Sequence, residues 1–244
     1  MSTRRMSNEQ AHDIARKGPG RVAYFFVRIV LMPVLRMLFA MRVSGKEHVP
    51  ARGPVVIAPN HKSFWDAFFI SAVLSRRIYF MGKAELFEGR AGKLLISLGG
   101  FPVRRGASDS EAIATALAIL ERGDALALFP EGTRVSDPAE LGQPRRGAAR
   151  IAIEGGAPIV PTAITGTEKR RFHLPRRVQV SFAAPIPVAE LRATPEDAGK
   201  LIEDAVWPVV SEDYRRLRAR PGLVAAGLAA VGVGIAVRRW RARR

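Results

Sequence analysis

The chain of 244 residues contains no cysteine and only four histidines. The absence of cysteine excludes disulfides, thiolate metal sites and a cysteine nucleophile. The histidines show no ligand spacing such as H-E-x-x-H, so we expect no metal site. The sequence has no zinc-finger, homeodomain or RNA-recognition signature. Residues 1–20 are polar, and we expect no cleavable signal peptide there.

What the sequence has in excess is positive charge, with a formal net charge of +17. Hydrophobic residues make up 48% and charged residues 25%, which is enough to build a core and excludes wholesale disorder. So large a charge indicates an anionic partner or surface. The basic residues alternate with aliphatic stretches more than with stacking aromatics. We therefore expect an anionic membrane surface as the partner, and no nucleic acid.

Residues 21–42 have the pattern of a helix that contacts a membrane. At about 100° per residue, four arginines fall within an arc of about 120° and the rest of the surface is apolar, the four being Arg21, Arg28, Arg36 and Arg42. Arginines inside a true span are costly, so the pattern favours interfacial helices over 21–44 with arginines facing headgroups. Pro33 is expected to kink or divide the helix. An amphipathic helix docked on the domain's own core is the alternative.

The C-terminal tail, residues 216–244, is basic and apolar. From Arg215 onward there are nine arginines and no acidic residue, and the apolar run 223–237 lies between them. Fifteen helical residues reach only about 22 Å, against about 30 Å of hydrocarbon. The tail is thus a possible membrane anchor, either interfacial, re-entrant or a marginal span, and a solvated helical tail is the alternative.

Between residues 45 and 215, short apolar runs alternate with helical patterns. This alternation predicts one α/β domain with a mostly parallel central sheet flanked by helices. We expect strands at 54–60, 77–82, 124–130, 157–166 and 177–186, a strand or loop at 100–106, and helices at 67–74, 83–99, 108–123 and 145–156. Ser108 and Glu111 form a predicted capping box. Residues 44–53 and 213–222 are the predicted linkers.

Three polar clusters emerge at comparable positions of the predicted fold: two follow predicted strands, where sites in α/β sheets form, and FPVRRG lies between a helix and the cap of the next helix. They are PNHKSFWD (59–66), FPVRRG (101–106) and FPEGTR (129–134). Each alone has a simple structural explanation. Ser63 can cap a helix with Asp66 in its first turn, FPEGTR can be a surface turn, and VRRG can be a basic loop. A lone His61 is more often a capping or core histidine than a catalyst.

Taken together, the clusters resemble the PlsC-type 1-acyl-glycerol-3-phosphate (lysophosphatidate) acyltransferases. The family's motif N-H-x-S-x-x-D is present at 60–66 and F-P-E-G-T-R at 129–134, with GGFPVRRG (99–106) as the second motif and IVPTAI, around Pro161, as the fourth. The similarity covers about residues 43–185. Arg104 and Arg105 compete for the second motif's arginine, and the register favours Arg105. Arg145 and Arg146 stand where many relatives carry lysine.

The resemblance implies transfer of a fatty acyl group from acyl-CoA or acyl-carrier protein to the free sn-2 hydroxyl of lysophosphatidate. His61 would be the general base, and Asp66 would fix its tautomer. The expected substrate-binding residues are Arg105, Glu131, Gly132, Thr133 and Arg134. Pro161 would line the acyl channel, and the Gly132 amide is a further candidate donor. The direct attack of a hydroxyl needs no acyl-enzyme, metal or other cofactor.

The implied reaction agrees with the predicted membrane contact, because the acceptor is a lipid in the bilayer and the donor is cytosolic. We expect a peripheral or monotopic protein on the cytoplasmic face of the cell membrane, with a C-terminal span as an open alternative. The basic patch 169–177 could dock CoA phosphates or an acidic carrier protein, or be a solvated loop. The rival functions are an acyltransferase with another acceptor (glycerol 3-phosphate, another lysolipid or a glycolipid) and a non-enzymatic basic binder.

Overall fold

The computed structural model describes residues 8–18, 21–104, 109–168 and 177–219. Their centre is a seven-stranded sheet with the order β1-β7-β6-β2-β5-β3-β4. The strands are β1 Arg42–Ser44, β2 Val55–Pro59, β3 Ile78–Lys83, β4 Gly100–Val103, β5 Ala125–Ala127, β6 Ile159–Thr165 and β7 Gln179–Phe182. Only the β6–β7 pair is antiparallel. The predicted α/β fold with a mostly parallel sheet is therefore confirmed.

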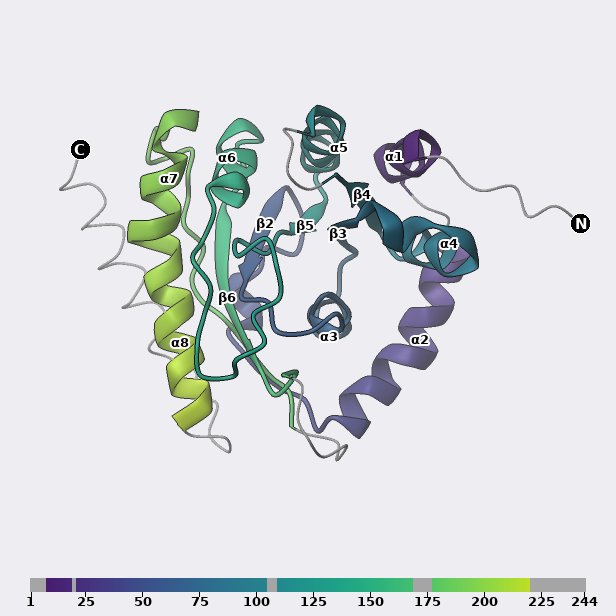
Figure 1. Cartoon of the computed structure of the whole chain (residues 1–244), viewed down its shortest axis with the longest axis horizontal. Coiled ribbons are helices and arrows are strands. Elements are labelled where there is room, and N and C mark those ends of the chain that lie inside the picture. Colours follow the sequence, from purple (N-terminus) through teal and green to yellow (C-terminus); the bar gives the residue numbers. More distant parts are fainter. Residues whose placement is uncertain (1–7, 19–20, 105–108, 169–176, 220–244) are drawn as a thin grey trace, which may run out of the picture.

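Helices cover both faces of the sheet (Figure 1). They are α1 Asn8–Lys17, α2 Arg21–Leu38, α3 Asp66–Val73, α4 Gly89–Ser97, α5 Ser110–Glu121, α6 Gly147–Glu154, α7 Ala198–Lys200 and α8 Trp207–Ala219. Side chains of β2 alternate between the two layers: Val56 and Ala58 pack with α5 and α6, whereas Val55 and Ile57 pack with α2 and α3. A strand buried on both faces reads as a continuous apolar run, which is why its position was predictable.

Two predicted helix boundaries differ in the structure. The helix predicted over 83–99, with Gly89 and Gly92 as possible interruptions, is broken at Glu88, between a short 3₁₀ turn at Ala84–Phe87 and α4, and it continues through Gly92. Gly89 opens α4 with a positive φ of 65°, which favours glycine. Helix α5 starts at Ser110 with Asp109 as its N-cap, whose side chain accepts from the amide of Ala112. The predicted cap Ser108 lies outside the described residues.

The second predicted linker, 213–222, is wrong over its described part. Helix α8 continues to Ala219 and packs against β6. Val210, Tyr214 and Leu217 are buried at helical spacing and hold α8 against the domain. The arginines interspersed among them, Arg215, Arg216 and Arg218, hid this apolar stripe in the sequence. The tail beyond Ala219 and the patch 169–176 lie outside the described residues.

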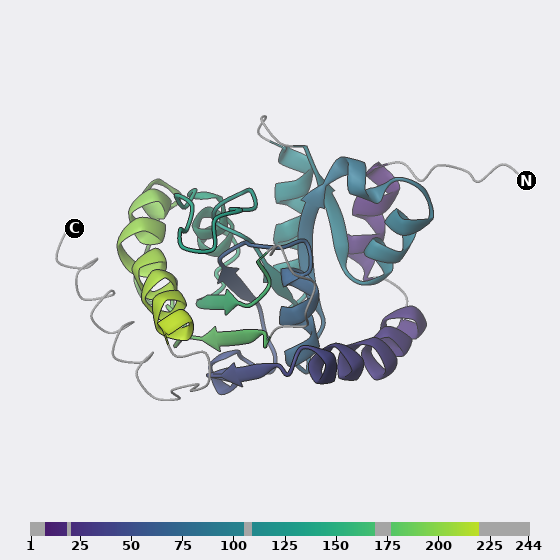
Figure 2. The same ribbon diagram turned by 60° about the horizontal axis from the view of Figure 1, so that its bottom comes forward.

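Helix α2 is a single helix that runs through Pro33 and ends before Arg42, which belongs to β1 (Figure 2). Of the two effects predicted for Pro33, a kink or a division, the division is excluded. Its exposed face is apolar and carries Phe25, Ile29, Val30, Val34, Met37 and Leu38. The predicted headgroup contact of Arg28 is also wrong, because its Nη2 donates to the carbonyl of Leu74 at 2.9 Å. Within the described ranges, no helix is both long and apolar enough to cross a bilayer.

Candidate active site

His61 and Asp66 form a hydrogen-bonded pair in the loop between β2 and α3. His61 Nδ1 lies 3.0 Å from Asp66 Oδ2, and the aspartate is fully buried. The same Oδ2 accepts the backbone amides of Lys62 and Ser63, each at 2.7 Å. These bonds fold the loop back over the carboxylate. Asp66 therefore orients the imidazole and shapes the loop that carries it.

Ser63 does not cap α3 as predicted. The N-cap residue of α3 is Trp65, and no side chain caps it. The Ser63 hydroxyl instead accepts from the amide of Trp65 at 3.3 Å, within the preceding turn. The side chains of Ser63 and Asp66 therefore form hydrogen bonds within the loop that carries His61, and neither caps α3.

The imidazole of His61 is held from a second side by Phe129, at the end of β5. The two rings are stacked, with centroids 3.9 Å apart and planes at 25°. Because β2 and β5 are neighbours, the histidine loop and the FPEGTR segment meet at the carboxyl edge of the sheet. With a proton on Nδ1 donated to Asp66, Nε2 is the basic nitrogen of the ring. His61 lines a hollow on each side of this stack.

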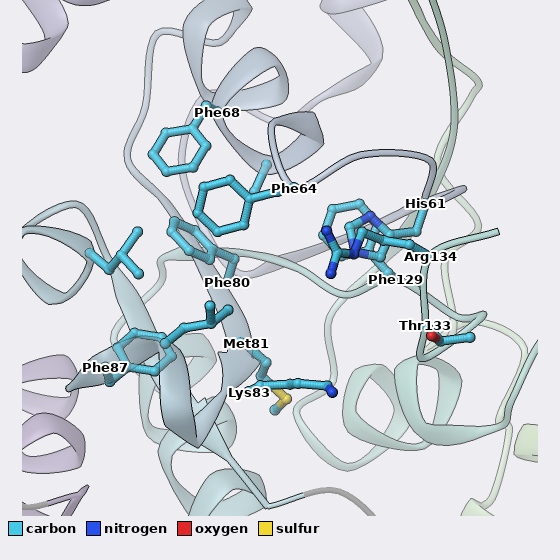
Figure 3. A pocket seen from close by; sticks show the side chains of 14 residues that line it. His61, Phe64, Phe68, Phe80, Met81, Lys83, Phe87, Phe129, Thr133 and Arg134 are labelled. Carbon is cyan, nitrogen blue, oxygen red and sulfur yellow. The ribbon is translucent and has the colours of Figure 1, made fainter. Parts of the chain in front are cut away.

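The first hollow has a volume of about 230 Å³ and is mostly apolar (Figure 3). Its wall comes from α3 and the loop before it, from β3 and the 3₁₀ turn that follows it, and from α4; it includes Phe64, Phe68, Phe80, Leu86, Phe87 and Leu95. Its rim carries two cations, Lys83 and Arg134, together with Thr133. Lys83 was missed in the sequence, although its place at the carboxyl end of β3 marks it as a residue of this edge.

The second hollow, of about 350 Å³, lies on the other side of the His61–Phe129 stack. Its floor is apolar, while Arg104, Gly132, Arg145 and the start of α6 at Gly147 and Ala148 also line it. Arg145 lies over Gly132, whose ideal Cβ would come within 3.3 Å of its Cδ. Arg105, which the register favoured, lies outside the described residues, whereas the competing Arg104 belongs to this hollow.

Glu131 lies apart from both hollows. Its side chain is buried, and Oε1 accepts the backbone amide of His61 at 3.2 Å. Burial raises the pKa of Glu131 to about 7, although the amides of His61 and Gly142 and the charge of Lys62 act in the opposite direction. The amide of Val135 in turn donates to the carbonyl of His61 at 3.0 Å. Glu131 therefore holds the loop that carries His61 through the backbone amide of His61.

Two other expectations do not match the geometry. The Gly132 amide donates to the carbonyl of Phe129 at 3.0 Å, so it closes a turn and is not presented to a hollow. Pro161 lies inside β6, in register with Ala58, and lines neither hollow. The adjoining Asn60 exchanges hydrogen bonds with the backbone of Ile164, which ties the histidine loop to that strand.

No group of histidine, aspartate and glutamate side chains that could hold a metal ion occurs in the part of the chain that the structure describes. The site consists of a histidine–aspartate pair at the carboxyl edge of a parallel sheet, flanked by an apolar hollow and several cations. A histidine whose Nδ1 is held by a carboxylate has the chemistry needed to accept a proton at Nε2.

A family model described as "Acyltransferase" matches residues 40–165. The chain belongs to this acyltransferase family. It is 34% identical over 145 residues to the 1-acyl-sn-glycerol-3-phosphate acyltransferase of Bacillus subtilis, which covers 59% of this chain and 71% of that protein. It is 29% identical over 135 residues to the chloroplastic 1-acyl-sn-glycerol-3-phosphate acyltransferase LPAT1 of Arabidopsis thaliana, 54% of this chain but only 37% of the plant protein.

The fold also matches a solved structure, that of the 1-acyl-sn-glycerophosphate (LPA) acyltransferase PlsC from Thermotoga maritima. The TM-score is 0.62 at 18% identity, covering 88% of this chain and 99% of the other. At this identity the match shows a shared fold.

Proposed function

We propose that this enzyme transfers a fatty acyl group from acyl-CoA or acyl-carrier protein to the sn-2 hydroxyl of lysophosphatidate, giving phosphatidate. The observation that carries the proposal is the position of His61 and Asp66, where an apolar hollow meets a cationic rim. Such a junction suits a reaction between a hydrocarbon thioester and a phosphate-bearing alcohol. The names of the relatives in Bacillus and Arabidopsis support the same acceptor.

In the proposed reaction, Nε2 of His61 takes the proton of the acceptor hydroxyl as its oxygen attacks the thioester carbonyl. Asp66 stabilises the imidazolium that forms. The tetrahedral intermediate then collapses, the carbon–sulfur bond breaks, and the imidazolium returns its proton to the departing thiolate. General-base catalysis of this kind contributes typically about 10²–10⁴-fold. The step needs neither an acyl-enzyme nor a cofactor.

The acyl chain and the acceptor phosphate use different parts of this site. The acyl chain of the donor occupies the first hollow, where burial of each methylene contributes about 0.8 kcal/mol. The acceptor phosphate lies at the cationic junction, held by Arg134 and Thr133 and by the second-motif arginine, for which Arg105 remains our candidate. Lys83 and, from the second hollow, Arg104 and Arg145 add charge-assisted donors. Gly132 leaves room for Arg145, and Glu131 serves by supporting the histidine loop.

The protein acts at a membrane surface, and its contact is the outward face of α2. A soluble domain rarely exposes so contiguous a row of large apolar side chains without a partner. The net charge of +17 adds attraction to anionic lipid. We propose a peripheral or monotopic enzyme on the cytoplasmic face, with α2 as the contact segment. The acyltransferase domain, expected to end at residue 215, extends through α8 to Ala219, which leaves 220–244 as a possible second anchor.

Flotation with vesicles tests the membrane contact. Binding to phosphatidylglycerol-containing vesicles should fall sharply when Val34 and Met37 on the exposed face are both replaced by Asp. The matched control is Glu9→Asp, an exposed change on α1, which should bind as the wild type does. Undiminished flotation of the double variant would exclude α2 as the contact.

The acceptor is tested by thiol release from palmitoyl-CoA in detergent micelles. We expect release that depends on lysophosphatidate and is abolished by His61→Ala. Glycerol 3-phosphate and lysophosphatidylcholine, assayed in parallel, test the rival acceptors. Release that requires one of these instead would replace the acceptor in the proposal. Equal rates in wild type and His61→Ala would overturn the catalytic assignment and favour a non-enzymatic basic binder.

A further inference from the structure

The segment that joins β5 to α6 carries two of the site's arginines, Arg134 near its start and Arg145 near its end. We call residues 134–145 the arginine loop. It contains no helix or strand, and it reaches across β6 toward α8 (Figure 1). A long irregular loop costs conformational entropy to hold in one geometry. The arginines can bind a phosphate at a fixed position only if the middle of the loop is fastened.

Lys62 fastens the middle of this loop. It follows His61 directly, and its side chain is almost fully buried. Its Nζ donates to the carbonyl of Asp137 at 2.7 Å and also to the carbonyl of Glu140. Burial lowers the pKa of the Lys62 ammonium, while the charges of Glu131 and Glu168 raise it. A buried ammonium is tolerated when carbonyl oxygens replace its water, and that is the arrangement here.

Tyr214 of α8 supplies a second fastening point. Its ring centroid lies 5.2 Å from Lys62 Nζ, a cation–π contact. Its hydroxyl lies 2.7 Å from the carbonyl oxygen of Pro138 and 3.1 Å from Oε1 of Glu168, which share its single proton. The carbonyls of Asp137, Pro138 and Glu140 are thus all held by Lys62 and Tyr214.

Lys62 has two separate tasks. Its backbone amide donates to Asp66 Oδ2 and so shapes the catalytic pair. Its side chain reaches residues more than 70 positions further along the chain, in the loop that carries the arginines. Lys62 therefore connects the loop that carries His61 with the loop that carries Arg134 and Arg145.

We propose that Lys62 is a positioning residue whose side chain, together with Tyr214, holds the arginine loop so that Arg134 and Arg145 face the substrate beside His61. Its role in acceptor binding rests on the function proposed above, whereas its role in holding the loop does not. The proposal separates the two tasks: a side-chain change that keeps the backbone amide should weaken acceptor binding and spare proton transfer.

The test variant is Lys62→Met, which keeps the length of the side chain and removes its ammonium. We expect the KM for lysophosphatidate to rise on the order of tenfold, because small misplacements of positioning groups have effects of this size or larger. The value of kcat should stay within about twofold of wild type, since an interaction lost equally from ground and transition states changes KM alone. Tyr214→Phe should shift KM in the same direction by less.

A second readout does not depend on catalysis. Trypsin cleaves after arginine, and Arg134 and Arg145 stand at the two ends of the loop. Lys62→Met should be cut at these positions faster than the wild type under native conditions, with the cut sites identified by mass spectrometry. Tyr214→Phe should show the same cuts at a lower rate.

The matched control is Arg76→Met. Arg76 is another cation that holds three backbone carbonyls, those of Pro50, Gly53 and Gly123, at 2.7–2.8 Å. These residues precede β2 and β5, so Arg76 lies at the amino edge of the sheet, opposite the site. Its loss should lower the Tm without raising the acceptor KM or exposing the arginine loop to trypsin.

If Lys62→Met loses stability but matches Arg76→Met in KM and in loop cleavage, Lys62 is merely structural and the proposal is overturned. If Lys62→Met does not fold, Tyr214→Phe decides by the same two readouts. If the wild type shows no lysophosphatidate-dependent release, the proposed function fails, and loop cleavage alone then decides whether Lys62 holds the loop.

Discussion

The two hollows beside His61 share His61, Met81 and Phe129 and differ in the rest of their lining. The first is lined by the aromatic rings of Phe64, Phe68, Phe80 and Phe87, with Lys83 and Arg134 at its rim. The second is bounded by Arg104, Arg145 and the start of α6. One side can exclude water from a hydrocarbon chain, and the other can offer donors to an anion. The difference teaches that a single histidine can serve both a hydrocarbon chain and a phosphate-bearing acceptor when it borders aromatic side chains on one hollow and arginines on the other.

The largest expected effect comes from replacing His61 or its partner Asp66. His61→Ala should lower kcat by at least about 10²-fold, the lower end of the contribution of a general base. Asp66→Asn should produce a loss of similar order, because an amide can hold the imidazole in the wrong tautomer. The double variant should lose no more than the worse single one, since the two residues act as a unit.

These variants are measured by acceptor-dependent thiol release, with circular dichroism as the control for folding. Additive losses in the double variant would contradict a shared role. The structure would then assign Asp66 only to the loop amides of Lys62 and Ser63 that it also binds.

The next effect should appear at the cationic rim of the first hollow. Arg134→Met removes a charge-assisted donor, which is worth about 1.5–3 kcal/mol, so the KM for lysophosphatidate should rise about ten- to hundredfold. Monoacylglycerol, which has no phosphate, serves as the control acceptor and should be used equally by both proteins. A rise in the KM for acyl-CoA without a rise for the acceptor would reverse the assignment of substrates to this junction.

A smaller effect is expected on the apolar side. Ala67 lines the first hollow and is almost fully buried. Ala67→Leu fills part of its volume, so the ratio of kcat/KM for palmitoyl-CoA to that for decanoyl-CoA should fall on the order of tenfold. The matched variant in the other hollow is Ala148→Leu, which should leave this ratio unchanged. An equal shift in both variants would show that the acyl chain is not confined to the first hollow.

The contact between His61 and Asp66 was predictable because it is local. His61 and Asp66 are five residues apart, and their motif carries its own geometry in the loop that follows a buried strand. The sheet was predictable for a similar reason, since parallel strands buried on both faces read as continuous apolar runs. Helix α8 was missed because arginines interrupt its buried stripe.

The roles of Lys62 and Glu131 were not predictable from periodicity or spacing. Lys62 looked like the variable position of a motif, and its partners lie in a loop far along the chain. Glu131 lay in a motif that pointed to substrate, yet its carboxylate contacts the backbone of His61. Both assignments depend on which loops the folded sheet brings together, and the local sequence does not show this. Arg105 lies outside the described residues and stays a prediction.

Glu131, which belongs to neither hollow, should have the smallest effect on acceptor binding. The folded protein holds the proton of Glu131 more tightly than the unfolded chain does, with a pKa of about 7 against the ordinary 4.5. This group's contribution to stability therefore falls as the pH rises from about 4.5 to 7, by at most about 3 kcal/mol. Glu131→Gln does not titrate and keeps an oxygen to accept the His61 amide. The free energy of unfolding of this variant, measured in urea, should therefore increase relative to that of the wild type between pH 5 and pH 7.5. Its KM for lysophosphatidate should stay close to the wild-type value. A gain in stability with a large rise in KM would place Glu131 among the groups that touch the substrate. The acceptor site would then include Glu131 as well as the residues that line the two hollows.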